Sequence, residues 1–394
     1  MKKLLMASTA AICFGTMASA DDVNVGIILG FTGPLESITP AMAAGAELAI
    51  AEINAAGGVA GDTLVPVRAD STCIDAAAAS AAATRLIDSD NVVAIMGADC
   101  SGVTTAIASN VAVPKGVVMI SPSATSPALS TIEDNDLFFR VAPSDARQGQ
   151  VLADVLTGRG ITNVAVTYTN NDYGKGLSDA FAAAFAAAGG SVTINASHED
   201  GKGDYSAEVG ALAAAGGEVL VVLGYVDQGG AGIMRTALDT GAFDTFVLGD
   251  GMYGQALLDN LGGDNLNGTF GTLPWSVGEG ADAFKALATA AGIDTDGPYI
   301  AESYDAAAVI ALAMAAGGSA DRASVAANVL AVSNAPGEPI LPGELAKALE
   351  ILAAGGDVDY QGATNVELIG PGEAAGTYRE FEVVGGAYET ISIR

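Results

Sequence analysis

The chain has 394 residues, is half hydrophobic and carries a formal net charge of −30. This length favours two domains over one and provides ample apolar material for a core. The negative charge, which no basic cluster offsets, argues against nucleic acid and anionic membrane surfaces as partners and suits a highly soluble surface.

Residues 1–20 have the pattern of a secretory signal peptide. Lys2 and Lys3 form a basic start, residues 4–17 an apolar run too short for a membrane anchor, and Ala-Ser-Ala at 18–20 a cleavage site. Cleavage would leave 374 residues (394 minus 20) and, with two lysines gone, a net charge of −32 (−30 minus 2). We therefore predict export to the periplasm.

An alternation of apolar strands and helical segments follows this leader. Strands are expected at 23–29, 64–69, 92–98 and 117–121, and helices at 41–56, 75–88 and 101–113. The alternation pauses over 122–140. Repeated βα units with short turns predict a parallel, doubly wound α/β sheet.

A second series of βα units predicts a second lobe of similar size. Its strands are expected at 164–168, 192–195, 219–224 and 246–249, and its helices at 147–159, 176–188, 206–215 and 229–240. More helices are expected at 281–291, 302–316, 320–332 and 344–354, and the β-like tail at 360–393 should complete one of the sheets. Such a chain crosses between its lobes more than once, and crossings act as hinges.

Motifs for catalysis and cofactor binding are scarce. The one histidine, His198, has no nucleophile pattern around it, and GIILGFTG at 26–33 lacks the G-x-G-x-x-G spacing of a dinucleotide loop. After signal cleavage Cys73 and Cys100 remain, which in an exported protein most simply form one disulfide, because two cysteines alone make a poor metal site. We therefore expect a binding protein without catalytic residues, cofactor or metal.

Polar residues follow several of the predicted strands. In open α/β sheets the carboxyl ends of the strands line the ligand crevice. Ser101 stands where it can cap its helix, whose first N–H groups could still bind a carboxylate. Asp250 lies between two glycines, a common setting for a turn residue. The candidates are Asp99, Cys100, Ser101, Ser121, Ser123 and Thr125 on the first lobe and 170–173, Tyr225 and Asp250 on the second.

Eight stretches carry a family resemblance along essentially the whole mature chain. They are GFTGP at 30–34, INAAGGVAG at 53–61, DSTC at 70–73, DCSGVT at 99–104, ISPSATSP at 120–127, NDYGKG at 171–176, GPY at 297–299 and ESYDAAA at 302–308. ISPSAT and NDYGKG are the most specific. The chain resembles periplasmic substrate-binding proteins of branched-chain amino acid ABC transporters, the leucine/isoleucine/valine-binding type.

The resemblance implies a type I periplasmic binding protein fold, in which two doubly wound parallel-sheet lobes are joined by a hinge of three crossings. We assign 21–141 and 273–356 to lobe 1, and 142–272 and 357–394 to lobe 2. It also implies a Cys73–Cys100 disulfide. The expected function is to bind an amino acid between the lobes and deliver it, as a monomer, to a membrane permease.

The same resemblance assigns roles to individual residues. Ser101, Thr125 and Tyr225 would hold the ligand's α-carboxylate. The Ser123 carbonyl, the Thr125 hydroxyl and Asp250 would hold its ammonium group. Tyr173 would pack on the ligand side chain, and Cys100 and Tyr304 are further candidates for the pocket.

Two departures affect the predicted specificity. Asp250 stands where the best-known members have Glu, so its shorter side chain needs a closer loop or a water. The loop at 35–38 lacks an aromatic residue and contains Glu36, which predicts a more polar side-chain pocket. A short amide, urea or an aromatic acid therefore remain alternative ligands, and a sensor subunit an alternative role.

Overall fold

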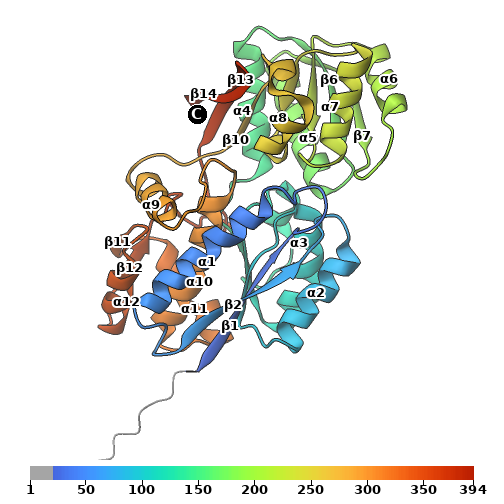
Figure 1. Cartoon of the computed structure of the whole chain (residues 1–394). Coiled ribbons are helices and arrows are strands. Elements are labelled where there is room, and N and C mark those ends of the chain that lie inside the picture. Colours follow the sequence, from blue (N-terminus) through green and yellow to red (C-terminus); the bar gives the residue numbers. More distant parts are fainter. Residues whose placement is uncertain (1–20) are drawn as a thin grey trace, which may run out of the picture.

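The computed structural model describes residues 21–394 and shows two lobes, each built on a twisted sheet with helices on both faces (Figure 1). The predicted signal peptide at 1–20 lies outside the described residues. The α/β fold class predicted from the sequence is confirmed, with one correction to the second sheet given below.

The sheet of the first lobe has the order β2-β1-β3-β4-β5, and all its strand pairs are parallel. Its strands are β1 (Asp22–Leu29), β2 (Thr63–Asp70), β3 (Ala94–Gly97), β4 (Val118–Ser121) and β5 (Phe138–Arg140). The central strands β3 and β4 are buried at every residue, as expected for a parallel sheet covered on both faces.

Helices from both halves of the chain cover this sheet. They are α1 (Thr39–Ala55), α2 (Ala76–Asp88), α3 (Ser101–Ile107), α10 (Ile300–Gly317) and α11 (Arg322–Ser333), and α12 (Leu345–Ala353) packs against α10 outside this layer. The predicted cap of α2 is confirmed, because the Asp75 carboxylate accepts hydrogen bonds from the N–H groups of Ala77 and Ala78.

Helix α10 is long and apolar enough to span a bilayer. However, 78% of its 18-residue apolar stretch is buried inside the protein, as in a core helix.

The second sheet has the order β14-β13-β10-β9-β8-β6-β7. Its strands are β6 (Asn163–Thr169), β7 (Ser191–His198), β8 (Val219–Leu223), β9 (Phe246–Leu248), β10 (Phe270–Pro274), β13 (Tyr378–Val384) and β14 (Ala387–Ile393). The helices of this lobe are α4 (Asp145–Gly158), α5 (Asp172–Ala187), α6 (Ser206–Ala215), α7 (Gly229–Thr240) and α8 (Gln255–Leu261).

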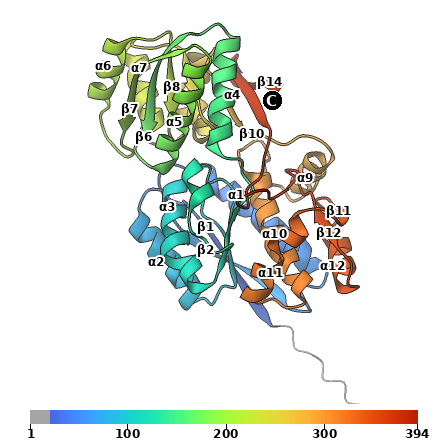
Figure 2. The same ribbon diagram turned by 180° about the vertical axis from the view of Figure 1, so that it is seen from behind.

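The C-terminal tail completes this second sheet, as the sequence predicted. Strands β13 and β14 add to β10 as an antiparallel hairpin, which lies beside α4 in both views (Figure 2). The second sheet is therefore mixed, whereas a parallel sheet was predicted. The hairpin turns at Gly385 and Gly386, whose φ values of 58° and 79° suit the two-residue loops that join antiparallel strands.

The chain passes between the lobes three times. The first passage follows β5, the second follows β10 and includes α9 (Glu279–Ala290), and the third precedes β13. The second and third passages are tied together, because Trp275 N–H donates to the Thr377 carbonyl at 3.0 Å.

The third passage lies later in the chain than the predicted division at 356/357. Strand β12 (Val358–Tyr360) pairs with β11 (Glu338–Ile340), and the Tyr360 hydroxyl donates to the buried Asp305 carboxylate of α10 at 2.7 Å. The Asp305 carboxylate also accepts the N–H groups of Ala363 and Thr364. The segment around β12 is thereby held on the first lobe, whereas the predicted division places it on the second.

Candidate functional site

A cavity of about 330 Å³, which includes space open to solvent, lies between the two lobes. Its first-lobe wall consists of Leu35, Ile38, Met42, Asp99, Cys100, Ser101 and Ser123. Its second-lobe wall consists of Tyr173, Tyr225, Asp250 and Gly251, and Tyr299 enters from the second passage. Most of these residues follow the carboxyl ends of strands, where ligands bind in open α/β sheets.

The lobes also touch outside the cavity. The Ser37 N–H donates to the Asp227 carboxylate at 2.8 Å, and the Asp227 N–H donates to the Pro34 carbonyl at 3.1 Å. The structure is therefore a closed arrangement in which residues far apart in the sequence face one another across the cavity.

The strand-end loops of the first lobe are held by internal hydrogen bonds. The buried Asp99 carboxylate accepts the Gly30 N–H at 2.9 Å and the Ser71 hydroxyl at 3.0 Å. Burial is the main cause that raises the pKa of Asp99, and these hydrogen bonds oppose it. The expected Cys73–Cys100 disulfide is present beside it, with the two Cα atoms 5.2 Å apart.

Ser101 is the first residue of α3 and does not cap it. Its hydroxyl instead accepts the Ser126 N–H at 3.1 Å, which ties the two first-lobe loops together. Ser123 donates its hydroxyl to the Asp99 carbonyl at 3.0 Å, and Ser121 donates to the Ala98 carbonyl. Ser101 and Ser123 line the cavity, whereas Ser121 holds the loop from behind.

Three predicted residues of the second lobe meet at the cavity. The Tyr173 hydroxyl donates to Asp250 Oδ1 at 2.9 Å, and the rings of Tyr173 and Tyr225 stack with centroids 5.2 Å apart. Asp250 is fully buried, and this burial raises its pKa although the tyrosine hydroxyls act in the opposite sense. Asp250 is therefore a buried acid inside a polar cluster, not an ordinary turn residue.

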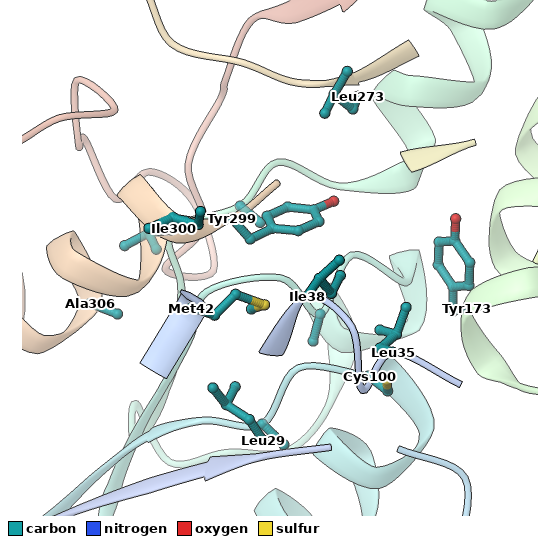
Figure 3. Close-up of a cluster of buried hydrophobic side chains, with 14 of the residues drawn as sticks. Leu29, Leu35, Ile38, Met42, Cys100, Tyr173, Leu273, Tyr299, Ile300 and Ala306 are labelled. Atoms are coloured by element: carbon teal, nitrogen blue, oxygen red, sulfur yellow. The ribbon is translucent and has the colours of Figure 1, made fainter. Parts of the chain in front are cut away.

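Tyr299 completes the Asp250 cluster and was absent from the predicted site. It donates its hydroxyl to Asp250 Oδ2 at 2.5 Å and lies opposite Tyr173, with Leu35 and Ile38 between them (Figure 3). The sequence proposed Tyr304 instead. Tyr304 lies five residues further along α10, where its hydroxyl donates to Glu52 at 2.6 Å and its ring contacts Phe284. Tyr299 is the aromatic residue that ends the GPY stretch, and this was the signal in the sequence that could have identified it as a site residue.

Asp145, the first residue of α4, also escaped the sequence-based prediction. It is completely buried, and neither carboxylate oxygen has a hydrogen-bond partner within residues 21–394. Burial raises its pKa well above the ordinary value and the negative charge of Asp250 raises it further, whereas the neighbouring Thr125 hydroxyl and the Arg140 guanidinium act in the opposite sense. The charge of Asp145 also raises the pKa values of Tyr173 and Tyr299, which places all four groups in one electrostatic cluster.

Other acceptors beside Asp145 are unpaired as well. Thr125 is fully buried, and its hydroxyl has no partner in the described part of the chain, nor does the side-chain carbonyl of Gln148. Thr125 does not line the cavity itself, and its loop is held by Arg140, which donates to the carbonyls of Ala124 and Ser126. Buried polar groups are normally paired, so this collection of acceptors fits a ligand that brings several donors.

The remaining wall is apolar. Leu35, Ile38 and Met42 face the cavity from the loop after β1 and the start of α1 (Figure 3). Glu36 is exposed and points away from this wall. Leu35 and Ile38 are buried while Glu36 and Ser37 between them are exposed, so the residue on which the prediction of a more polar side-chain pocket rested does not line the cavity.

The two lobes, the three passages and the cavity between strand ends define a type I periplasmic binding protein. The family profile described as "Periplasmic binding protein" matches residues 22–346, so the chain belongs to that family.

Curated relatives agree with this assignment. The chain is 35% identical to a Leu/Ile/Val/Thr-binding protein of Salmonella typhimurium over 179 residues, which is 45% of this chain and 48% of that protein. The chain thus spans about half the length of that relative. It is 30% identical to the leucine-specific-binding protein of the same species over 320 residues, covering 79% of this chain and 84% of that protein.

Solved structures share the fold. A leucine-binding protein from Thermotoga maritima superposes with a TM-score of 0.77 at 23% identity, covering 94% of this chain and 98% of the other. The substrate-binding protein of a branched-chain amino acid transporter from Streptococcus pneumoniae, solved with isoleucine, gives a TM-score of 0.76 at 22% identity, covering 95% of this chain and 99% of the other. A solute-binding protein from R. palustris, solved with benzoate, gives 0.75 at 17% identity, covering 94% and 96%.

Proposed function

We propose that the protein binds a free aliphatic α-amino acid, of the branched-chain type, in the cavity between its lobes. The observation that carries this proposal is the asymmetry of the cavity surroundings. Asp250 lines one part, and its charge reaches the buried Asp145, which does not line the cavity. The other part has hydroxyl groups beside an apolar wall, and the Asp99 carboxylate there is already paired with the Gly30 N–H and the Ser71 hydroxyl. An ammonium group suits the first part and a carboxylate the second.

The ammonium group would bind to Asp250, with Asp145 and the Thr125 hydroxyl as further acceptors. A cation there would stabilise the ionised forms of both acids, whose pKa values burial now raises. The α-carboxylate would lie against Ser101 and Tyr225, whose hydroxyl already accepts a hydrogen bond from Asn171 at 3.4 Å. Tyr173 and Cys100 complete the walls.

The ligand side chain would lie against Leu35, Ile38 and Met42. These residues present hydrocarbon and sulfur surface, and burying a leucine or isoleucine side chain contributes about 2 kcal/mol. Together with charge-assisted hydrogen bonds in a closed cavity, this is sufficient for micromolar affinity, about −8 kcal/mol.

An aromatic acid is the second candidate, because the stacked Tyr173–Tyr225 pair presents ring surface and one structural neighbour was solved with benzoate. It is less favourable on electrostatic grounds. A carboxylate without an ammonium group would add a third negative charge close to Asp145 and Asp250, with no cation to offset it.

We further propose that the protein is exported to the periplasm, acts as a monomer and delivers its ligand to an ABC-transporter permease. Closure of the lobes over the ligand would produce the shape that the permease recognises. The membership of the chain in the periplasmic binding protein family supports this role. A receptor role, not an enzymatic one, is also what its relatives have in common.

Isothermal titration of ligand-free protein against the twenty common amino acids, urea, small amides and benzoate tests the proposal. Leucine, isoleucine or valine should bind at micromolar concentration or tighter, and benzoate should not. If only benzoate binds, or only urea, the proposed ligand is an aromatic acid or urea and not an amino acid.

A further inference from the structure

A second cavity, of about 850 Å³, lies on the far side of Tyr299 from the first. It is bounded by the end of β10 with Trp275, by α9, and by the first turn of α10. Tyr299 is the one residue that lines both cavities. The second cavity therefore adjoins the hinge passage and is separate from the ligand site proposed above.

The most informative group in this cavity is Glu302. Glu302 is only 6% exposed, yet it lines the cavity. Among the described residues its carboxyl group is hydrogen-bonded only by its own backbone N–H. Its carboxyl group therefore faces the cavity with acceptor capacity that either water or a bound ligand can use.

The remaining lining shows what kind of group would pair with it. Trp275, Phe284 and Tyr299 contribute aromatic rings to the cavity. Aromatic faces beside a carboxylate are the surroundings that attract alkylated ammonium ions, since the face of a ring carries partial negative charge.

The charged residues around the cavity also favour a cation over an anion. Asp282 and Asp296 also line it beside Glu302, against one basic lining residue, Lys285. The Arg379 guanidinium lies 4.8 Å from the centroid of the Trp275 ring, so this ring already takes one cation in the structure. The net charge of −30 on the whole chain raises the local concentration of cations further.

We propose that this second cavity is a binding site for a small organic ammonium ion, with Glu302 as its counter-ion and Trp275, Phe284 and Tyr299 as its aromatic walls. The site does not depend on which ligand occupies the cavity between the lobes, so its test can fail or succeed independently of the proposed function.

Fluorescence provides a direct test, because Trp275 is the only tryptophan of the chain. Choline chloride is titrated into the full-length mature protein, with sodium chloride at matched ionic strength as the reference and 3,3-dimethylbutan-1-ol as the uncharged analogue of choline. Choline should change the emission saturably at millimolar concentration or below, whereas the alcohol should not. Equal responses to choline and the alcohol, or none to choline, would overturn the proposal.

Three variants locate the bound cation. Glu302→Gln should weaken choline binding about tenfold or more, because the negative counter-ion of the quaternary ammonium group is lost. Glu279→Gln is the matched control, since Glu279 is an exposed residue of α9 that does not line this cavity, and it should bind as the wild type. If Asp250→Asn abolishes binding and Glu302→Gln does not, the cation occupies the first cavity and the proposal is wrong.

Proton release gives a second readout that does not depend on Trp275. Burial raises the pKa of Glu302 to about 8, and the negative charge of Asp305 on the same helix adds to the effect. Asp282 and Lys285 of α9, Asp296 and Tyr299 face the same space. A cation that pairs with Glu302 should expel a proton from it at pH 7, measured by calorimetry in two buffers. Release that persists in Glu302→Gln would contradict the assignment.

Discussion

Asp250→Asn is the substitution that separates ligand binding from stability most clearly. Asparagine keeps the shape of the side chain but loses the charge and one of the two acceptors that Tyr173 and Tyr299 now use, at 2.9 and 2.5 Å. Removing one partner of a buried charged pair in a binding site costs roughly 2–5 kcal/mol. The affinity for leucine should therefore fall by about 30-fold to 1,000-fold or more.

The same substitution should leave the ligand-free protein at least as stable. Burial raises the pKa of Asp250, so ionising it in the folded state costs stability as the pH rises through that pKa. Asparagine removes this cost. The melting temperature without ligand should stay constant or increase, most clearly at alkaline pH.

Calorimetric titration with leucine and thermal unfolding without ligand provide the two measurements. Asp239→Asn, an exposed residue of α7 in the same lobe, is the matched control and should change neither. Leucine binding to Asp250→Asn within threefold of the wild-type affinity would refute the assignment of Asp250 as the ammonium partner.

Three further predictions follow from other parts of the chain. Replacing both Cys73 and Cys100 by serine opens a loop of 27 residues and should lower the free energy of unfolding by about 3–4 kcal/mol, measured by guanidinium denaturation. Leu35→Ala should weaken leucine binding about tenfold while leaving glycine binding unchanged, because only the apolar wall is altered. Burial lowers the pKa of His198 to about 4, so the stability gained by keeping it neutral is full above pH 6.5 and is lost as the pH falls toward 4. In thermal unfolding at different pH values, the melting temperature of His198→Gln should therefore fall less steeply over that window than that of the wild type.

The pH dependence of leucine binding is a fifth prediction and concerns both buried acids. The pKa values of Asp145 and Asp250 are raised, and their protonated forms attract an ammonium group less than their ionised forms do. Leucine affinity, measured calorimetrically from pH 8 to pH 5, should therefore decrease as the pH is lowered. An affinity that increases over this range would contradict the assignment of the ammonium site.

Much of the fold could be predicted because hydrophobic pattern and helix signals agree locally. The helices expected at 206–215 and 229–240 have those bounds in the structure. Strand β5 and helix α8 were missed because they have three and seven residues, too few for a periodic pattern. The antiparallel addition of β13 and β14 depends on pairing with β10, a long-range contact that local pattern does not encode.

The candidate site was predictable where residues follow strands and less so elsewhere. Ser101, Ser123, Tyr225 and Asp250 do line one cavity, as strand-end positions suggested. Tyr299 precedes a helix and reaches the cavity from the hinge passage. Asp145 was identified by its burial and by its electrostatic interaction with Asp250. Both depend on how the chain packs, and no local sequence pattern indicates them.

The central claim is that the cavity between the lobes binds both charged groups of an amino acid at once. Calorimetry of ligand-free protein with L-leucine, with 4-methylpentanoate, which lacks the amino group, and with 3-methylbutylamine, which lacks the carboxylate, tests this most directly. We predict micromolar or tighter binding of leucine and at least a hundredfold weaker binding of each analogue, since each leaves one set of buried groups unpaired. Binding of 4-methylpentanoate as tightly as leucine would contradict the account.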